Sequence, residues 1–239
     1  MMEYSGTNEL ENLEKFTPRY NRDVIRRFTK AILKETFEDP KVRTLDFGAG
    51  LGTITRGVQE ELGARVFCLE VDSTLCDKLV ADGFEVHDEL SKFEQTFQFI
   101  YTSNVLEHIE DDALAILNLY GKLEPNGQLL IYVPAFPFLY SEMDEKVGHF
   151  RRYTRSELVQ KLSDARFDIE TIYYVDSIGY VASIFMKLVG FQRTGNIGGE
   201  SSLLFYDKYI WPLSKLLDSI GFKYLFGKNI FVVARKESH

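Results

Sequence analysis

Cysteine is scarce in this sequence, with Cys68 and Cys76 as the only two among 239 residues. This scarcity excludes a disulfide framework, fits a reducing compartment and predicts a cytoplasmic protein. The first ten residues contain neither a basic region nor an apolar run, so we expect no secretory signal. The longest nearly uncharged apolar stretch, residues 178–190, is shorter than the roughly 20 residues that cross a membrane. We therefore expect at most a peripheral position on the inner face of a membrane.

Positive charge is also in short supply. The chain has 28 Lys and Arg against 36 Asp and Glu, a net charge of −8, which argues against nucleic acid as a partner. Residues 176–239 are the exception, with 8 basic and 5 acidic residues. The length and the 45% hydrophobic content suit one globular domain.

Short apolar runs alternate with helix-like segments along most of the chain. We expect strands over residues 42–47, 65–71, 84–87, 97–102, 128–133, 168–175 and 230–234. We expect helices over residues 18–33, 72–81 and 112–123, one ending at 62, and one after the capping box at 154–157. Residues 125–127 are predicted to form a turn. Alternation at this pitch predicts a parallel sheet with helices on both faces.

The interval 176–229 is longer than a connection between two strands needs. Apolar residues recur there three and four positions apart, which predicts one face of an amphipathic helix: Leu203, Tyr206, Ile210, Leu213, Leu217 and Ile220. The charged residues are expected largely opposite: Asp207, Lys208, Lys215 and Asp218. Pro212 should kink this helix or separate two shorter ones. The interval is interpreted either as a lid that meets anionic lipid or as a packing or dimer contact.

A glycine cluster follows the first expected strand. The segment reads Asp46-Phe47-Gly48-Ala49-Gly50-Leu51-Gly52, which has GxGxG spacing in place of the GxGxxG spacing of nicotinamide-dinucleotide loops. Glycines let the backbone approach a ligand closely, and the following helix offers free N–H groups. A ligand with an ammonium and a sulfonium gains from Asp46 by Coulomb attraction. Glu70 and Asp88, which end the next two strands, are placed to accept hydrogen bonds from a ribose and an adenine.

These motifs resemble those of class I S-adenosylmethionine-dependent methyltransferases. The matching blocks are DFGAGLG at 46–52, LEVD at 69–72, TSNVLEHIEDD at 102–112 and LEPNGQLLIYVP at 123–134. Three later blocks, at 140–158, 203–213 and 226–236, resemble a bacterial subgroup that is often associated with surface-glycan genes. The resemblance extends from about residue 20 to residue 236.

The resemblance implies an α/β fold with a Rossmann-like seven-stranded sheet of order 3-2-1-4-5-7-6, whose last strand is antiparallel, and helices on both faces. It implies one domain over 1–239, comprising an N-terminal helical lid (1–40), a cofactor-binding core (41–175), a helical insertion (176–229) and the last strand (230–236). S-adenosylmethionine would be the cofactor and S-adenosylhomocysteine the product. The residues expected to hold it are Tyr20, Asp46, Phe47, Gly48, Ala49, Gly50, Glu70, Val71, Asp88, Glu89, Asn104 and Val105. Tyr20 is interpreted either as a lid residue or as a packing aromatic.

Methyl transfer to a hydroxyl requires a base for the proton, and histidine suits this role near neutral pH. His149 is the first candidate and His108 the second. Five residues are expected to contact the acceptor: Glu107, Tyr140, Asp144, Arg151 and Arg152. Either histidine has a structural alternative, and the two arginines alternatively pair with local carboxylates.

A metal site is weighed at the same place, because some ubiquinone-pathway and small-RNA methyltransferases have an E-x-x-E-H motif there. In this chain Asn104 replaces the first carboxylate ahead of Glu107 and His108. Hard divalent cations prefer anionic oxygen ligands, so we predict no metal.

The sequence thus predicts an S-adenosylmethionine-dependent methyltransferase that acts on an oxygen of a small or lipid-linked glycan or related metabolite. N-methylation, another S-adenosylmethionine reaction on the same fold and a non-catalytic cofactor-binding protein are the alternatives. The expected partners are a small-molecule or lipid-linked acceptor and a peripheral membrane contact through 176–220, with the chain a monomer or homodimer.

Overall fold

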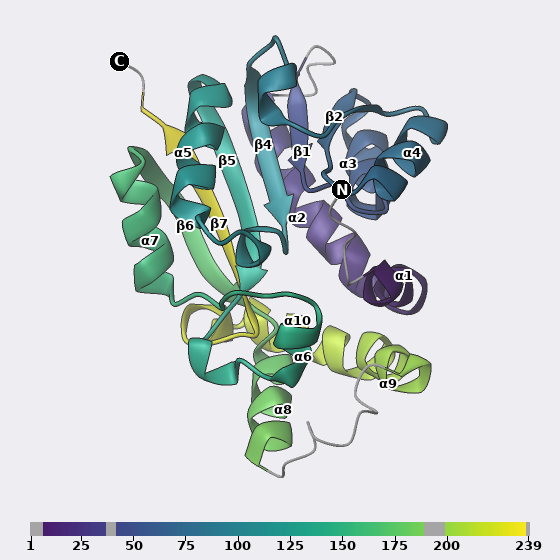
Figure 1. Cartoon of the computed structure of the whole chain (residues 1–239). Helices are drawn as coiled ribbons and strands as arrows, with labels where there is room; N and C mark the ends of the chain where they lie inside the picture. The colour runs from purple at the N-terminus through teal and green to yellow at the C-terminus, as the bar shows by residue number, and fades with distance from the viewer. Residues whose placement is uncertain (1–6, 37–41, 189–198, 238–239) are drawn as a thin grey trace.

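A seven-stranded sheet forms the centre of the molecule in the computed structural model, which describes residues 7–36, 42–188 and 199–237. The strands are β1 (Thr44–Phe47), β2 (Val66–Leu69), β3 (Glu85–His87), β4 (Phe97–Ser103), β5 (Leu123–Pro134), β6 (Phe167–Val175) and β7 (Asn229–Lys236). Their order is β3-β2-β1-β4-β5-β7-β6, and β7 runs antiparallel to both β5 and β6 (Figure 1). The predicted fold and strand order are confirmed.

Ten α-helices are described around this sheet. They are α1 (Thr7–Phe16), α2 (Pro18–Thr36), α3 (Thr53–Leu62), α4 (Ser73–Ala81), α5 (Asp112–Lys122), α6 (Glu142–Lys146), α7 (Arg155–Asp164), α8 (Ser177–Leu188), α9 (Glu200–Phe205) and α10 (Trp211–Ser219). A π-helical segment, Tyr206–Ile210, joins α9 to α10, and a 3-10 turn, Leu106–His108, follows β4. The helices α6, α8, α9 and α10 gather beyond the carboxyl ends of the parallel strands (Figure 1).

The two faces of the sheet are covered by different helices because neighbouring strand residues point to opposite sides. On β4, Phe99 and Tyr101 pack in one core with α2 and α3, whereas Ile100 packs in a second core with α5 and α7. Apolar residues at four-residue intervals, such as Val24, Phe28 and Ile32, fix the buried face of α2, and Phe28 and Ile32 are fully buried.

The expected turn at residues 125–127 lies inside β5. Phe97 pairs with Leu123, and the register with β4 shifts between Phe97 and Phe99. Asn126 has a φ of 63°, so the polar residues that suggested a turn form an irregularity within one longer strand.

The amphipathic stripe expected between 203 and 220 is wrong. Leu213 and Ile220 are 47% and 68% exposed, whereas Asp207 and Asp218 are buried. The π-helical segment Tyr206–Ile210 changes the helical phase between α9 and α10, so one stripe cannot continue through both. Pro212 lies in the first turn of α10, directly after the π-helical segment, and the helical conformation continues from α9 through α10 without a break at this proline.

The buried carboxylates of this region are stabilised by hydrogen bonds. Asp207 accepts hydrogen bonds from the backbone N–H groups of Arg19 and Tyr20, at 3.0 and 2.9 Å, and so caps α2 from a distant part of the sequence. Asp218 accepts a hydrogen bond from the backbone N–H of Asp176 at 2.9 Å. These hydrogen bonds connect the insertion to the start of α2 and to the end of β6.

Some sequence expectations concern residues outside the described ranges, namely residues 1–6 and 37–40 of the N-terminal lid and residues 189–198 of the insertion, which include the end of the 178–190 stretch. Within the described ranges, no helix has the length and apolar content needed to cross a membrane.

The cap on α2 can be tested by substitution. Asp207→Ala leaves two N–H groups of α2 without this acceptor and should lower the free energy of unfolding by about 1–2 kcal/mol in urea titrations. Asp207→Asn, which keeps an acceptor oxygen, should lose less. The adjacent exposed variant Lys208→Ala is the control, and equal stability of Asp207→Ala and that control would contradict the capping role.

Candidate functional site

The glycine loop connects the end of β1 to the start of α3. Gly48 and Gly50 have positive φ angles, 84° and 54°, which L side chains rarely adopt. A Cβ on Gly48 would lie 2.3 Å from the side chain of Val105, so glycine is required there by packing as well. The loop therefore lies directly against the segment that follows β4.

Glu70 holds this loop in place. Its carboxylate accepts hydrogen bonds from the backbone N–H groups of Gly50, Val71 and Asp72, at 2.7, 2.8 and 3.0 Å. Glu70 follows β2, whose parallel pairing with β1 brings the two strand ends together. The expected neighbours Asp46, Gly48, Gly50 and Glu70 are thus adjacent in space.

Asp46 is a buried carboxyl group on β1. It accepts a hydrogen bond from the hydroxyl of Thr55 at 2.7 Å and forms no ion pair with any described residue. Burial raises its pKa to about 7, and hydrogen bonding by Thr55 offsets only part of that effect. The sequence analysis missed Thr55, although a hydroxyl residue in the first turn after a glycine loop is a visible signal.

The remaining expected cofactor residues differ in exposure. Val71 is 65% exposed, and Asp88 and Glu89 are exposed at the end of β3. Asp88 forms an ion pair with Lys92, which together with its hydrogen bond lowers the pKa of Asp88. Phe47 is half-buried against the α5 and α7 core, and Ala49 is buried beside Cys68.

Asn104 and Tyr20 lie at the carboxyl end of β4. Asn104 has a φ of 54°, and its backbone N–H donates to the carbonyl oxygen of Tyr132 at 2.8 Å. The ring of Tyr20, at the start of α2, lies 4.9 Å from that of Trp211 and 6.2 Å from that of Tyr132. Burial raises the pKa of Tyr20 to about 12, and interactions with Tyr132 and Asn104 offset part of this rise. Tyr20 is therefore a packed aromatic that faces Asn104.

A second cluster contains Glu107 and His108, in the 3-10 turn that follows β4, and His149, which lies between α6 and α7. Glu107 is fully buried, and neither carboxyl oxygen has a hydrogen-bond partner among the described residues. His149 Nε2 lies 3.9 Å from Glu107 Oε1, and the two imidazole rings are 4.6 Å apart. Burial raises the pKa of Glu107 to about 8, whereas burial and the neighbouring His149 lower the pKa of His108 to about 4.

Asp144 orients His149. His149 Nδ1 lies 2.8 Å from Asp144 Oδ1, and Arg152 Nε donates to the same oxygen at 2.9 Å. Both the backbone N–H and the hydroxyl of Ser141 also donate to Asp144. Burial alone would raise the pKa of Asp144, but the hydrogen bond from His149 and the charge of Arg152 hold it well below its usual range. These contacts occupy the carboxylate, so Asp144 serves His149 and Arg152 rather than an open acceptor site.

The other expected acceptor contacts are also engaged. Arg151 pairs with Asp112 at 2.7 Å and donates to the carbonyl oxygen of Glu110, which is the local pairing weighed as its alternative. The hydroxyl of Tyr140 donates to the carbonyl oxygen of His149 at 2.6 Å. Arg152 retains one buried amino group, Nη1, with no hydrogen-bond partner among the described residues.

The same cluster has donor atoms of the kind that hold a metal ion. One ligand atom each from Glu107, His108 and His149 lies within 4.8 Å of the others. The structure thus places Glu107 and His108, which the sequence analysis weighed for metal binding and argued against, beside His149, which was not part of that motif.

Comparison with known proteins identifies relatives of this arrangement. A family model described as a methyltransferase domain matches residues 14–172. No curated protein matches the chain in sequence. An S-adenosylmethionine-dependent methyltransferase from Mesorhizobium loti is 16% identical, with a TM-score of 0.57 over 88% of this chain and 96% of that one.

Two further solved structures have a similar fold. Phosphoethanolamine N-methyltransferase 2 from Haemonchus contortus, in complex with phosphomonomethylethanolamine and S-adenosylhomocysteine, is 17% identical (TM-score 0.57; 100% of this chain, 61% of that one). The [4+2]-cyclase SpnF is also 17% identical (TM-score 0.57; 89% of this chain, 82% of that one). At these identities the likeness shows the fold alone.

The buried Glu107 gives a prediction about stability. Its pKa is about 8 in the folded chain and 4.5 in the absence of such burial, so only the folded protein retains this proton between those pH values. Stability should therefore fall as the pH rises from about 5 to about 8. In EDTA at pH 8, Glu107→Gln should raise the free energy of unfolding by on the order of 2 kcal/mol and flatten the pH dependence.

Urea titrations across this pH range measure both effects. Glu110→Gln, an exposed neighbour with the same chemical change, is the matched control and should leave the profile unaltered. A Glu107→Gln protein no more stable than that control at pH 8 would show that Glu107 is not a buried, neutral carboxyl group.

Proposed function

The chain belongs to the methyltransferase-domain family and is an S-adenosylmethionine-dependent methyltransferase, and from this premise we propose that it methylates an oxygen atom of a small or lipid-linked glycan or related metabolite. The observation that carries the proposal is the Asp144–His149 pair beside the end of β4. A hydroxyl acceptor must lose a proton, and a histidine oriented by a carboxylate is suited to take it.

The residues of the glycine loop fit the cofactor. Gly48 packs tightly against Val105, which holds the loop at the end of β4, and Asp46 is a buried carboxyl group with no cationic partner among the described residues. We assign the methionine part to Asp46, Gly48 and Gly50. Glu70, which organises the loop backbone, is assigned to the ribose. Asp88 and Glu89 are assigned to the adenine.

The bound cofactor supplies a methyl group already activated by a sulfonium centre. The chain's own residues then have to position the acceptor and remove its proton. We assign proton removal to His149 Nε2, because Nδ1 is engaged by Asp144. Asp144 fixes the ring and stabilises the imidazolium once it forms. Burial and the neighbouring His149 lower the pKa of His108 to about 4, which makes His108 a weak base.

Acceptor recognition is assigned to the polar groups around this pair. Arg152 Nη1 is buried and has a free donor direction, which suits a hydroxyl or an anionic oxygen of the acceptor. Neutral Glu107 can donate its proton in a hydrogen bond or accept one. The N-terminal helices and the insertion, 1–40 and 176–229, would enclose the acceptor. The blocks at 140–158, 203–213 and 226–236 are the basis for a glycan-related acceptor.

The pKa of Asp46 gives a test of cofactor binding. A cationic ligand favours the ionised carboxylate, so affinity for S-adenosylmethionine should rise between about pH 6 and pH 8, around the pKa of about 7. Asp46→Asn should weaken binding at pH 8 by about tenfold or more and remove the pH dependence. Calorimetry measures both.

Asp77→Asn, an exposed change of the same kind on α4, should leave the affinity unaltered, and NAD should bind poorly to all three proteins. Unchanged affinity in both Asp46→Ala and Glu70→Ala proteins with intact folding would refute the assigned cofactor site.

The base is tested by single-turnover and steady-state rates. His149→Ala should reduce turnover by about 10²-fold or more while cofactor affinity stays close to wild type. His108→Ala, the matched change on the neighbouring ring, should reduce turnover less. The reverse order would transfer the role to His108, and normal turnover in both would mean catalysis by positioning alone.

The metal alternative is distinguished in the same assay. Because Asn104 supplies no anionic oxygen, turnover should be insensitive to EDTA and to added Mg²⁺ or Mn²⁺. Loss of activity in EDTA with recovery on adding a divalent ion, absent in Glu107→Gln, would instead assign Glu107, His108 and His149 to a cation.

A further inference from the structure

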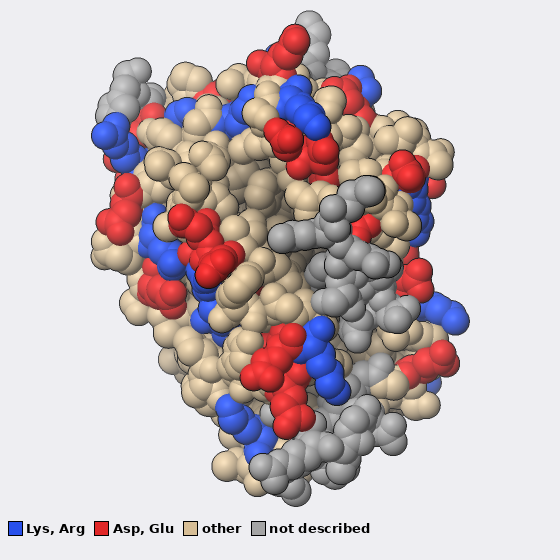
Figure 2. Space-filling model, in the orientation of Figure 1, with Lys and Arg blue, Asp and Glu red and all other residues tan. Residues whose placement is uncertain are grey.

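A row of basic side chains lies along the outer side of α2. It comprises Arg19, Arg22, Arg26, Lys30 and Lys34, which we call the basic row. Intervals of three and four residues place them on one side of the helix, and all five are exposed. Acidic and basic side chains are interspersed on the face shown in Figure 2, whereas α2 covers the face of the sheet opposite α5 and α7. The basic row is therefore a local concentration of positive charge on an acidic protein.

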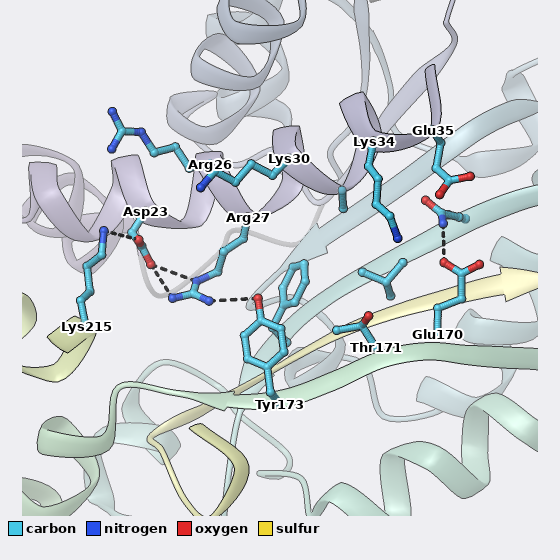
Figure 3. Close-up of a pocket in the computed structure, with 14 residues that line it drawn as sticks. Asp23, Arg26, Arg27, Lys30, Lys34, Glu35, Glu170, Thr171, Tyr173 and Lys215 are labelled. Carbon is cyan, nitrogen blue, oxygen red and sulfur yellow. Dashed lines mark hydrogen bonds and ion pairs between the residues drawn. The ribbon is translucent and has the colours of Figure 1, made fainter. Parts of the chain in front are cut away.

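The positive charge of this row is not neutralised by nearby acids. A groove of about 410 Å³ separates α2 from β6 and β7, and its three carboxylates all have partners: Asp23 binds Arg27 and Lys215, and Glu35 and Glu170 both bind Arg235. Arg26, Lys30 and Lys34, which also line the groove, form no hydrogen bond or ion pair with a described residue (Figure 3). The same holds for Arg22.

A row of exposed aliphatic side chains lies on α10 and directly after it. Leu213, Leu216 and Ile220, which we call the apolar row, are 47%, 59% and 68% exposed. Trp211, Ser214 and Asp218 form the buried side of α10, so the aliphatic residues lie on its exposed side.

The two helices that carry these rows border a common groove. A second groove of about 310 Å³ is lined on α2 by Arg19, Arg22, Asp23 and Arg26, and on α10 by Trp211, Pro212 and Lys215. The ion pair between Lys215 and Asp23, at 2.6 Å, fixes the two helices to each other. The adjoining 3-10 turn adds two exposed apolar residues, Tyr224 and Leu225.

We propose that the basic row and the apolar row together form a docking surface for an anionic lipid membrane. Aliphatic side chains in a line gain by leaving water for the acyl boundary, and the flanking cations attract anionic head groups. This pairing of charge and apolar surface selects a membrane over a nucleic acid, which would be recognised by the cations alone. The proposal extends beyond the assigned reaction and does not depend on the acceptor.

Vesicle co-sedimentation with the full chain tests the proposal. Wild-type protein should bind vesicles of phosphatidylcholine with phosphatidylglycerol, bind pure phosphatidylcholine weakly, and lose most binding at high salt. Reversing three charges, Arg22→Glu, Arg26→Glu and Lys30→Glu, should weaken binding by about tenfold or more. Leu216→Ser with Ile220→Ser should weaken it as well, with less dependence on salt.

A matched charge reversal elsewhere on the surface, Lys78→Glu, Lys146→Glu and Arg155→Glu, should retain binding, because these exposed residues lie on α4, α6 and α7. Circular dichroism and cofactor affinity confirm folding of each variant. No binding by wild type, or equal loss in the matched reversal, would overturn the proposal. It would also be overturned if Leu216→Ser with Ile220→Ser converted a dimer to monomers without changing vesicle binding, or if the charge reversal affected binding to DNA but not to vesicles.

Discussion

The arrangement of the site depends on the burial of one carboxyl group. Glu107 is the one buried Asp or Glu among the described residues whose carboxyl oxygens both lack a hydrogen-bond partner. Its neighbours are satisfied: Asp144 by His149, Arg152 and Ser141, and Asp112 by Tyr153 and Lys161. A polar group buried without partners costs stability, and natural proteins accept that cost mainly at functional sites. The burial of Glu107 therefore supports the assignment of the acceptor and its proton to this cluster.

The helices beyond the carboxyl ends of the parallel strands are held together by contacts between residues far apart in sequence. Asp207 caps α2, and Asp218 and Asp176 join α10 to the end of β6 through Ser177 and Ser214. Gly179 is required there, because a Cβ would collide with the carboxylate of Asp176 at 1.8 Å. These buried contacts join the first turn of α2, which carries Tyr20, to the π-helical segment, and join α10 to the end of β6.

The sequence predicted the parts of this architecture that follow local rules. Strand order came from family motifs, and the positions of Asp46 and the glycines came from a turn whose geometry is set within a few residues. It did not predict that Thr55 would bond Asp46. The stripe through Leu213 failed because a π-helical segment changes the helical phase. Asp207 within that segment caps α2, a contact across 188 positions. Helical periodicity alone contains no information about such tertiary contacts.

The burial of Asp207 and Asp218 determines which side chains α10 exposes. Because Asp207 and Asp218 occupy the inner side, the aliphatic residues of α10 face outward, and α10 borders a groove with the basic row of α2. A chain with a net charge of −8 is repelled by an anionic surface in most orientations, so a single basic row selects the orientation in which contact is attractive. The row lies on the 19-residue helix whose first turn holds Tyr20 against Trp211. A membrane engaged by that helix would therefore lie beside the turn of α2 that packs against Trp211 of the insertion.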